Sequence, residues 1–435
     1  MGSNRFLTRR RTVLAGGLTL LAAGPAAAAE RAAPGHGHRP GWTGTWAAAP
    51  TGVPASADTV FEDQTLRQVV HTSIAGDRLR VRLTNEFGEQ PLVVGEAQLA
   101  RGASGGSGTA IEPGSERVLR FGGRGHLVLP PGAARWSDPV PLRSPAGSDL
   151  VVSVYLPRRT RAATVHSSAF QHGYVAAGNV VGKTDIEPVS TNTSWHFLSG
   201  VAARTAPGHR PRAVVTLGDS ITDGSVTEVG ANHRWPDHLA RRLREAPGPD
   251  PVGVLNAGIG GNRLLRDPNP PAGSPAEDYA AYFGESGLRR FDRDVARQPG
   301  VRYVTVLLGV NDLGHPGRDA PVDEEVTAAE LIAGHRRLIA RSHARGLRVL
   351  GGTVLPFKGD SLGFYTPERE AARTALNRWI RTGGGYDGVI DFDAAVRDPA
   401  DPERLRAGFD SGDGLHPNDA GMSAMAEAVP LRFFR

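Results

Sequence analysis

The sequence predicts two folded parts, a β domain over residues 41–204 and a doubly wound α/β domain over residues 205–435. In the first part apolar and polar residues alternate with a period of two, which is typical of half-buried strands. In the second part short apolar runs alternate with helical patterns, which favours a parallel sheet with crossover helices. Turn-forming residues at 205–208 separate the two. A chain of 435 residues is long enough to bury a sizeable core.

Residues 1–29 have the pattern of a removable export signal. Arginines come first with no acid, an apolar run follows at 13–23, and three alanines end the segment. Arg10 and Arg11 stand directly before the apolar run, as in twin-arginine signals. We therefore expect a secreted, extracellular protein exported by a twin-arginine type signal. Residues 30–40, rich in Ala, Gly, Pro and His, are expected to form a linker.

The net charge of the chain says little about a partner. The formal charge is +5, but the first 29 residues carry four arginines, and the remainder has 46 basic against 45 acidic residues. Nucleic-acid binding needs a concentrated basic surface, so no nucleic-acid partner is expected. No later segment reaches the ~20 apolar residues of a transmembrane helix, so no stable membrane anchor is expected.

The chain contains no cysteine. This excludes disulfides, thiol catalysis and zinc–thiolate sites. The histidines of the second part are scattered, without a ligand spacing such as HExxH, so neither a metal nor a cofactor is expected.

The first part is predicted to be an all-β sandwich or jelly roll. Residues 127–129 and 151–156 are further β-rich runs, Gly, Pro, Ser and Asp punctuate the segment, and no stretch has a helical period. At residues 78–83 three arginines alternate with Leu, Val and Leu, which predicts a solvated arginine face. His71, His166 and His172 are expected to be buried partners or surface groups rather than catalysts.

The second part is predicted to be a single α/β domain. Its expected strands are residues 213–217, 252–256, 303–308, 347–355 and 389–392, and its expected helices are residues 235–244, 288–296, 328–345 and 367–382. Active sites of such folds lie outside the carboxyl ends of the strands. We therefore expect reactive side chains at those ends.

Three strand ends carry distinctive segments. The first strand ends in GDSITDG at 218–224 with Ser220, and the second in NAGIGGN at 256–262. The third ends in GVND at 309–312, which presents the amide of Asn311 at the same edge. Each segment alone is weak evidence, because Gly-Asp-Ser is ordinary in turns and an asparagine is a common helix cap. The glycine segment does not have the GxGxxG spacing of a dinucleotide loop.

A fourth segment, DGLHP at 413–417, places an acid and a histidine three residues apart. Asp413 can accept a hydrogen bond from one ring nitrogen of His416 and leave the other nitrogen to take a proton from Ser220. A serine hydroxyl is a poor nucleophile without such a base.

In this order the four segments resemble the SGNH/GDSL hydrolase family, and the resemblance covers residues 212–434. It implies a three-layer α/β fold and a serine ester hydrolase. It further implies that Ser220 is the nucleophile, that His416 carries the proton, and that Asp413 orients His416.

The resemblance also implies an oxyanion hole formed by the backbone N–H of Ser220, the backbone N–H of Gly261 and the side-chain amide of Asn311. The sequence leaves open whether Gly260 or Gly261 supplies the second donor. Asn262 stands where many relatives carry Asp, which departs from the family pattern without touching its four named residues.

An N-terminal β domain before the hydrolase looks like the arrangement in bacterial exported arylesterases and acylhydrolases. We expect a secreted ester hydrolase that cleaves short-chain acyl, aryl or carbohydrate acetyl esters, with a small-molecule or polysaccharide ester as its substrate. The alternatives are a lipase or phospholipase, and a non-catalytic glycan-binding protein on the same fold. The long connection at 263–285 is expected to shape the pocket.

Overall fold

The structure is a computed structural model that describes residues 41–103, 108–205, 208–246, 248 and 250–434. The expected export signal at 1–29 and the linker at 30–40 lie outside the described residues. Among the described residues, none of the helices combines the length and apolar character that a bilayer crossing requires.

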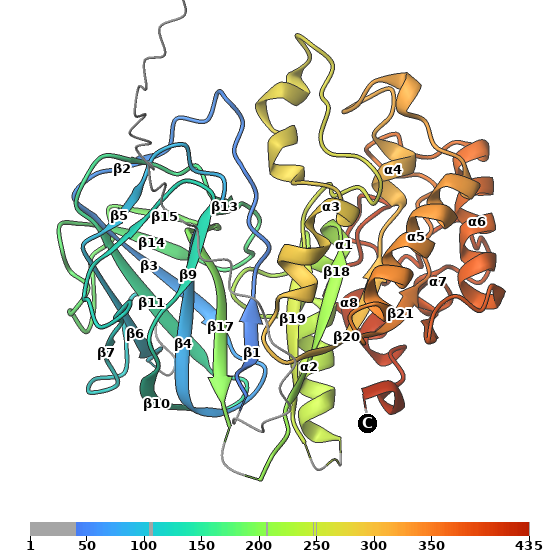
Figure 1. Cartoon of the computed structure of the whole chain (residues 1–435). Helices are drawn as coiled ribbons and strands as arrows, with labels where there is room; N and C mark the ends of the chain where they lie inside the picture. Colours follow the sequence, from blue (N-terminus) through green and yellow to red (C-terminus); the bar gives the residue numbers. More distant parts are fainter. Residues whose placement is uncertain (1–40, 104–107, 206–207, 247, 249, 435) are drawn as a thin grey trace, which may run out of the picture. The chain divides into compact units, whose positions relative to one another are not determined.

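The N-terminal region is built from strands, and no helix occurs among its described residues up to 204 (Figure 1). One antiparallel sheet has the order β1-β17-β4-β10 with β9 paired to β4, and a second has the order β15-β14-β3-β11-β6-β7. The strands of the region are β1 (Thr43–Ala47), β2 (Val60–Phe61), β3 (Gln64–His71), β4 (Gly76–Asn85), β5 (Leu92–Val94), β6 (Glu96–Arg101), β7 (Arg117–Val118), β8 (Leu127–Leu129), β9 (Ala133–Trp136), β10 (Val140–Ser144), β11 (Asp149–Leu156), β12 (Thr160–Arg161), β13 (Val165–His166), β14 (Gly173–Ala177), β15 (Ser190–Asn192), β16 (Trp195–His196) and β17 (Leu198–Arg204).

The two sheets share one hydrophobic core. Val81 of β4 and Val152 of β11 are fully buried members of the same cluster, although they belong to different sheets. Two antiparallel sheets that bury their inner faces against each other are the basis of a sandwich. The region is therefore mostly β, as the sequence predicts.

The arginine face of β4 is not simply solvated. The guanidinium of Arg80 lies 4.7 Å from the ring centroid of Trp42 and 4.5 Å from that of Trp136. Burial lowers the pKa of Arg80 to about 10. Arginine side chains commonly stack on aromatic rings. The period-two pattern could not indicate this contact, because the two tryptophans are distant from Arg80 in the sequence.

The C-terminal region contains a five-stranded parallel sheet with the order β19-β18-β20-β21-β22 (Figure 1). This is the doubly wound order 2-1-3-4-5, in which the second strand is added on one side of the first strand and the later strands on the other side. Its strands are β18 (Arg212–Gly218), β19 (Val252–Gly258), β20 (Val301–Leu307), β21 (Arg348–Gly352) and β22 (Gly388–Ile390). The α/β fold is confirmed, whereas the three-layer arrangement stays a prediction.

All four predicted helices occur; the helix at 367–382 has the predicted bounds, and the other three differ by one or two residues at an end. The helical elements are α1 (Ser220–Asp223), α2 (Trp235–Glu245), η1 (Pro275–Asp278), η2 (Ala280–Phe283), α3 (Gly287–Phe291), η3 (Asp292–Ala296), α4 (Val310–Gly314), η4 (Val322–Glu324), α5 (Ala328–His343), α6 (Pro367–Thr382), α7 (Phe392–Val396), α8 (Asp419–Glu427) and η5 (Leu431–Phe434). The predicted helix at 288–296 is an α-helical turn, α3, that continues as the π-helical turn η3.

The N-terminal strands contact the edge of the parallel sheet, because β1 lies against the edge strand β19. The Gly44 N–H donates to the carbonyl of Pro299 at 2.8 Å, and the Val254 N–H donates to the Ser73 hydroxyl at 3.0 Å. An uncovered edge strand exposes unpaired backbone groups and invites aggregation. The contact with β1 covers this edge. The described residues from 41 onward form one compact unit.

Candidate active site

Ser220 lies directly beyond the carboxyl end of the central strand β18, as the first residue of α1. The residue before it, Asp219, caps the helix by accepting the Ile221 N–H at 3.0 Å. Burial of Asp219 raises its pKa to about 7. Ser220 is 7 % exposed, so its hydroxyl is held in a largely enclosed position.

The structure brings His416 and Asp413 to Ser220 from a segment almost two hundred residues later. His416 Nε2 lies 2.8 Å from Ser220 Oγ, and His416 Nδ1 lies 2.6 Å from Asp413 Oδ2. The other oxygen of Asp413 accepts the backbone N–H groups of His416 at 2.8 Å and Leu415 at 2.9 Å. The loop is thus folded around the carboxylate that orients the ring.

The hydrogen-bond partners determine the protonation pattern of the three groups. Burial raises the pKa of Asp413, but the His416 ring and the backbone N–H groups lower it more, so the pKa lies below its usual range. An ionised carboxylate only accepts, so Nδ1 of His416 carries a proton and donates. The lone pair of Nε2 is then free to accept the Ser220 O–H, as a general base requires.

The loop after β19 presents the second backbone donor. The Gly260 N–H donates to Asp223 Oδ2 at 3.1 Å, so this donor is occupied. Among the described residues no partner is present for the Gly261 N–H. Gly261 has a φ of 72°, and a Cβ there would lie 2.1 Å from the Phe283 ring. The geometry therefore favours Gly261 over Gly260 as the donor, although its role in the reaction stays a prediction.

Asn311 lies in the first turn of α4, beyond the end of β20, and is buried. Its Nδ2 donates one hydrogen bond to the carbonyl of Asn262 at 3.1 Å. An amide nitrogen carries two hydrogens, so the second remains for a substrate oxygen. Asn311 is therefore anchored to the same loop that contains Gly261.

The structure explains why residue 262 is an asparagine. Its Nδ2 donates to the carbonyls of Phe283 at 2.7 Å and Glu285 at 2.9 Å, which an ionised aspartate could not do. Its Oδ1 accepts the Nε–H of Arg290 at 3.0 Å. Asn262 thus uses both polar atoms of its side chain in hydrogen bonds, two of which an ionised aspartate could not make.

Arg290 is a structural residue of the site that the sequence did not indicate. It is fully buried, and burial lowers its pKa to about 10. Its guanidinium donates to the carbonyls of Gly218 at 2.8 Å and Ala257 at 2.7 Å, and pairs with Asp294 at 3.3 Å. It therefore links the carboxyl ends of β18 and β19, next to the loops that contain Ser220 and Gly261. No sequence motif indicates such a residue; only the i, i+4 spacing of Arg290 and Asp294 could have suggested an ion pair.

Aromatic side chains lie beside the Gly261 loop. The ring centroid of Phe283, in the long connection, lies 4.8 Å from that of His315, and the ring centroid of Phe364 lies 5.6 Å from that of His315. Burial lowers the pKa of His315 to about 3, so its ring is neutral. The connection at 263–285 therefore contributes an aromatic surface next to the predicted oxyanion hole.

One group of described residues could present metal ligands, namely Glu228, His233 and Asp419, whose ligand atoms lie within 4.8 Å of one another. His233 Nδ1 and Asp419 Oδ2 lie 2.5 Å apart, so a hydrogen bond already uses these atoms. Sequence spacing did not reveal the group because Asp419 is far from the other two. None of the three residues belongs to the predicted catalytic set.

Comparison with known proteins supports the family assignment. The GDSL-like Lipase/Acylhydrolase family matches residues 216–424. No curated protein matches the chain. Among solved structures, the chain is similar to the lipase/acylhydrolase from Enterococcus faecalis, at 20% identity over 50% of this chain and 92% of that one, with a TM-score of 0.36.

It is also similar to an acetylxylan esterase from Geobacillus stearothermophilus, at 20% identity over 51% of this chain and 93% of that one, with a TM-score of 0.36. These likenesses are too distant to carry an argument, and the assignment depends on the family match and on the motifs that it contains. Through residues 216–424, the chain belongs to the GDSL-like lipase/acylhydrolase family, the SGNH/GDSL hydrolases that its four segments resemble.

Proposed function

We propose that the protein is a secreted serine ester hydrolase that cleaves short-chain acyl, aryl or carbohydrate acetyl esters through an acyl-serine intermediate. Membership of an acylhydrolase family supports ester hydrolysis in general. The catalytic residues, the substrate class and export through the twin-arginine type signal are our inferences. The proposal assigns Ser220 as the nucleophile, His416 as the base and Asp413 as the group that orients His416.

The observation that carries the proposal is the continuous hydrogen-bond chain from Asp413 through His416 to Ser220, with contacts of 2.6 Å and 2.8 Å. A serine and a histidine without a shared role would not need to be aligned in this way. In a serine hydrolase the same contacts allow the base to withdraw the hydroxyl proton while the carboxylate stabilises the resulting imidazolium.

In the acylation step Ser220 Oγ attacks the ester carbonyl carbon while its proton moves to His416 Nε2. The carbonyl oxygen becomes an oxyanion, and the N–H groups of Ser220 and Gly261 with the Asn311 amide would stabilise it. Collapse of the tetrahedral intermediate breaks the bond to the alcohol oxygen. That oxygen takes the proton from Nε2, and the alcohol leaves.

Deacylation repeats the sequence with water as the nucleophile. His416 removes a proton from the water as its oxygen attacks the acyl carbon, and the oxyanion forms at the same donors. The intermediate then collapses to the free acid, and the proton on Nε2 returns to Ser220 Oγ. The two half-reactions as written use the ester, one water molecule and groups of the chain.

A panel of esters tests the proposal. Purified full-length protein is assayed with aryl acetate, aryl butyrate, long-chain aryl esters and acetylated xylan, with Ser220→Ala as the control. We expect hydrolysis of the short esters by the wild type, and a loss of about 10³-fold or more in Ser220→Ala. Equal, negligible hydrolysis by both proteins would refute the esterase assignment and leave the glycan-binding alternative. A clear preference for long-chain esters would instead support a lipase or phospholipase.

A further inference from the structure

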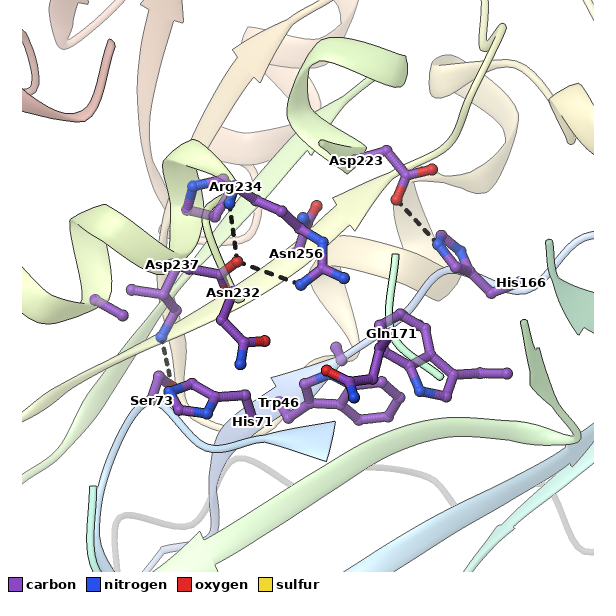
Figure 2. A pocket seen from close by; sticks show the side chains of 16 residues that line it. Trp46, His71, Ser73, His166, Gln171, Asp223, Asn232, Arg234, Asp237 and Asn256 are labelled. Atoms are coloured by element: carbon purple, nitrogen blue, oxygen red, sulfur yellow. Dashed lines mark hydrogen bonds and ion pairs between the residues drawn. The ribbon is translucent and has the colours of Figure 1, made fainter. Parts of the chain in front are cut away.

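The N-terminal β region contributes a side chain to the motif that contains Ser220. His166 of β13 places Nε2 2.9 Å from Oδ1 of Asp223, the last residue of α1 (Figure 2). Both side chains are only 4 % exposed. On the other side of the ring, Nδ1 of His166 lies 3.0 Å from the carbonyl oxygen of Ala49.

Asp223 connects this contact to the predicted oxyanion hole. Its Oδ2 accepts the Gly260 N–H at 3.1 Å, and Gly260 immediately precedes Gly261. Its backbone is equally confined, because a Cβ on Gly258 would lie 2.2 Å from the Asp223 nitrogen. The orientation of this one carboxylate therefore affects how the Ile259–Gly260 peptide is held, which directly precedes the peptide that carries the Gly261 N–H.

The partners of His166 indicate that its ring is charged. The Ala49 carbonyl can only accept, so Nδ1 carries a proton. Burial lowers the pKa of His166, but the Asp223 carboxylate and the Ala49 hydrogen bond outweigh burial, and the net pKa is raised. The second proton then lies on Nε2 and is donated to Asp223. A charge-assisted hydrogen bond of this kind is stronger and more directional than a neutral one.

The pocket around the pair is lined by residues from both regions (Figure 2). Arg234, which precedes α2, pairs with Asp237 at 3.2 Å and also donates to the Ala169 carbonyl of the β region. Its positive charge opposes that of His166 and lowers the pKa of the ring. The rings of Trp195 and His166 lie 5.4 Å apart. The pair is thus enclosed, and bulk water does not screen it.

We propose that His166 is a positioning residue for ester hydrolysis: it holds Asp223 so that Asp223 occupies the Gly260 N–H and leaves the Gly261 N–H directed at the substrate. This inference rests on the proposed function. It gives the N-terminal β region a part in the reaction that requires no contact between that region and the substrate.

The kinetic test compares His166→Gln, which keeps one neutral donor, with His166→Phe, which keeps none. We expect kcat for an aryl acetate to fall ~10-fold in His166→Gln and ~100-fold in His166→Phe, with KM changed by less than about threefold. These losses do not exceed the lower end of the 10²- to 10³-fold cost of deleting an oxyanion donor outright. The inhibition constant of an aryl boronic acid, which forms a tetrahedral adduct, should rise in parallel with the loss of kcat.

A double-mutant cycle tests whether His166 acts through Asp223. Asp223→Asn should itself lower kcat, and adding His166→Phe to it should lower kcat no further. The double variant removes both charges, so it remains informative even if His166→Phe leaves an unpaired carboxylate and fails to fold. His71→Gln is the matched control, because it breaks another histidine–aspartate contact of the β region, to Asp149 at 2.7 Å. It should retain the kcat of the wild type.

Hydrogen exchange followed by mass spectrometry gives a readout that needs no activity. Peptides that cover residues 256–262 should exchange faster in His166→Gln than in the wild type, and should not change in His71→Gln. Folded His166 variants with kcat within threefold of the wild type and unaltered exchange would overturn the proposal. An inactive wild type would refute the proposed function instead, and the exchange result would still decide whether His166 positions the loop.

Discussion

Replacement of the two adjacent glycines, Gly260→Ala and Gly261→Ala, separates the oxyanion donor from its neighbour. Gly261 has a φ of 72°, a left-handed conformation that costs a residue with a side chain ~1–2 kcal/mol. The new Cβ would also lie 2.1 Å from the Phe283 ring. The peptide or the ring must move, and either shift displaces the Gly261 N–H.

At Gly260 the same substitution makes no close contact. The nearest atom to a Cβ is the Ser168 hydroxyl at 3.9 Å, and the backbone does not have a positive φ. The Gly260 N–H remains available to Asp223 in the alanine variant. Gly260→Ala is therefore a control of identical chemistry one residue away.

We expect Gly261→Ala to lower kcat for an aryl acetate by about 10²- to 10³-fold, which is the usual cost of one misplaced oxyanion donor, ~2.7–4 kcal/mol. Gly260→Ala should stay within about threefold of the wild type. Both variants should remain folded, because backbone strain of ~1–2 kcal/mol is less than the ~5–15 kcal/mol by which a native domain is typically stable. The reasoning is refuted if the two variants lose activity equally, or if Gly260→Ala is the more damaged enzyme.

Three further predictions concern residues around the site. Arg290→Met should lower the free energy of unfolding by ~3–5 kcal/mol in urea titrations, because buried partners such as Asp294 lose a charged donor; a loss below ~1 kcal/mol would contradict this. The raised pKa of Asp219, about 7, means that the native state binds more protons than the unfolded state between about pH 4 and 7, so the wild type loses stability as pH rises through that window. Asp219→Asn cannot titrate, so its stability relative to the wild type should increase from pH 5 to pH 8, and a constant difference would argue against a buried, protonated Asp219. Gly253→Ala should lower kcat although Gly253 lies outside the active site.

The elements that the sequence predicts well are those with a strong local signal. α6 occupies the predicted residues 367–382, because Thr366 caps it by accepting the Arg369 N–H and Pro367 suits the first turn. The parallel strands were found because each is a continuous apolar run. The helices α1 and α4 were missed because four or five residues contain too little of a helical period to detect.

The candidate site divides in the same way. Ser220 and Asn311 could be predicted because each belongs to a short motif at a strand end, and Asp413 and His416 because they share a short motif in a loop before α8. The partner of Asp223 could not, because His166 lies in another type of structure and 57 residues away. A buried acid within a motif needs a hydrogen-bonding partner, so the sequence could have indicated that Asp223 has one. Only the fold shows that this partner is His166.

The expectation for Gly253→Ala follows from the course of the chain between the edge strand and His166. A Cβ on Gly253 would lie 2.2 Å from the Gly44 carbonyl oxygen, so the substitution must push β1 away from β19. β1 pairs with β17, which follows β16 with one residue between them, and β16 pairs with β13. Because β13 carries His166, a shift of β1 should weaken the contact between His166 and Asp223.

Gly253→Ala should therefore resemble His166→Gln, with a lower kcat, little change in KM and faster exchange in residues 256–262. Gly248→Ala is a suitable control, since a Cβ there meets no atom within 4 Å. If Gly253→Ala kept full activity while its unfolding free energy fell, β1 would stabilise the edge of the sheet without influencing the loop. The contact at the edge strand and the contact at Asp223 would then be independent, and the β region would contribute to the active site through His166 alone.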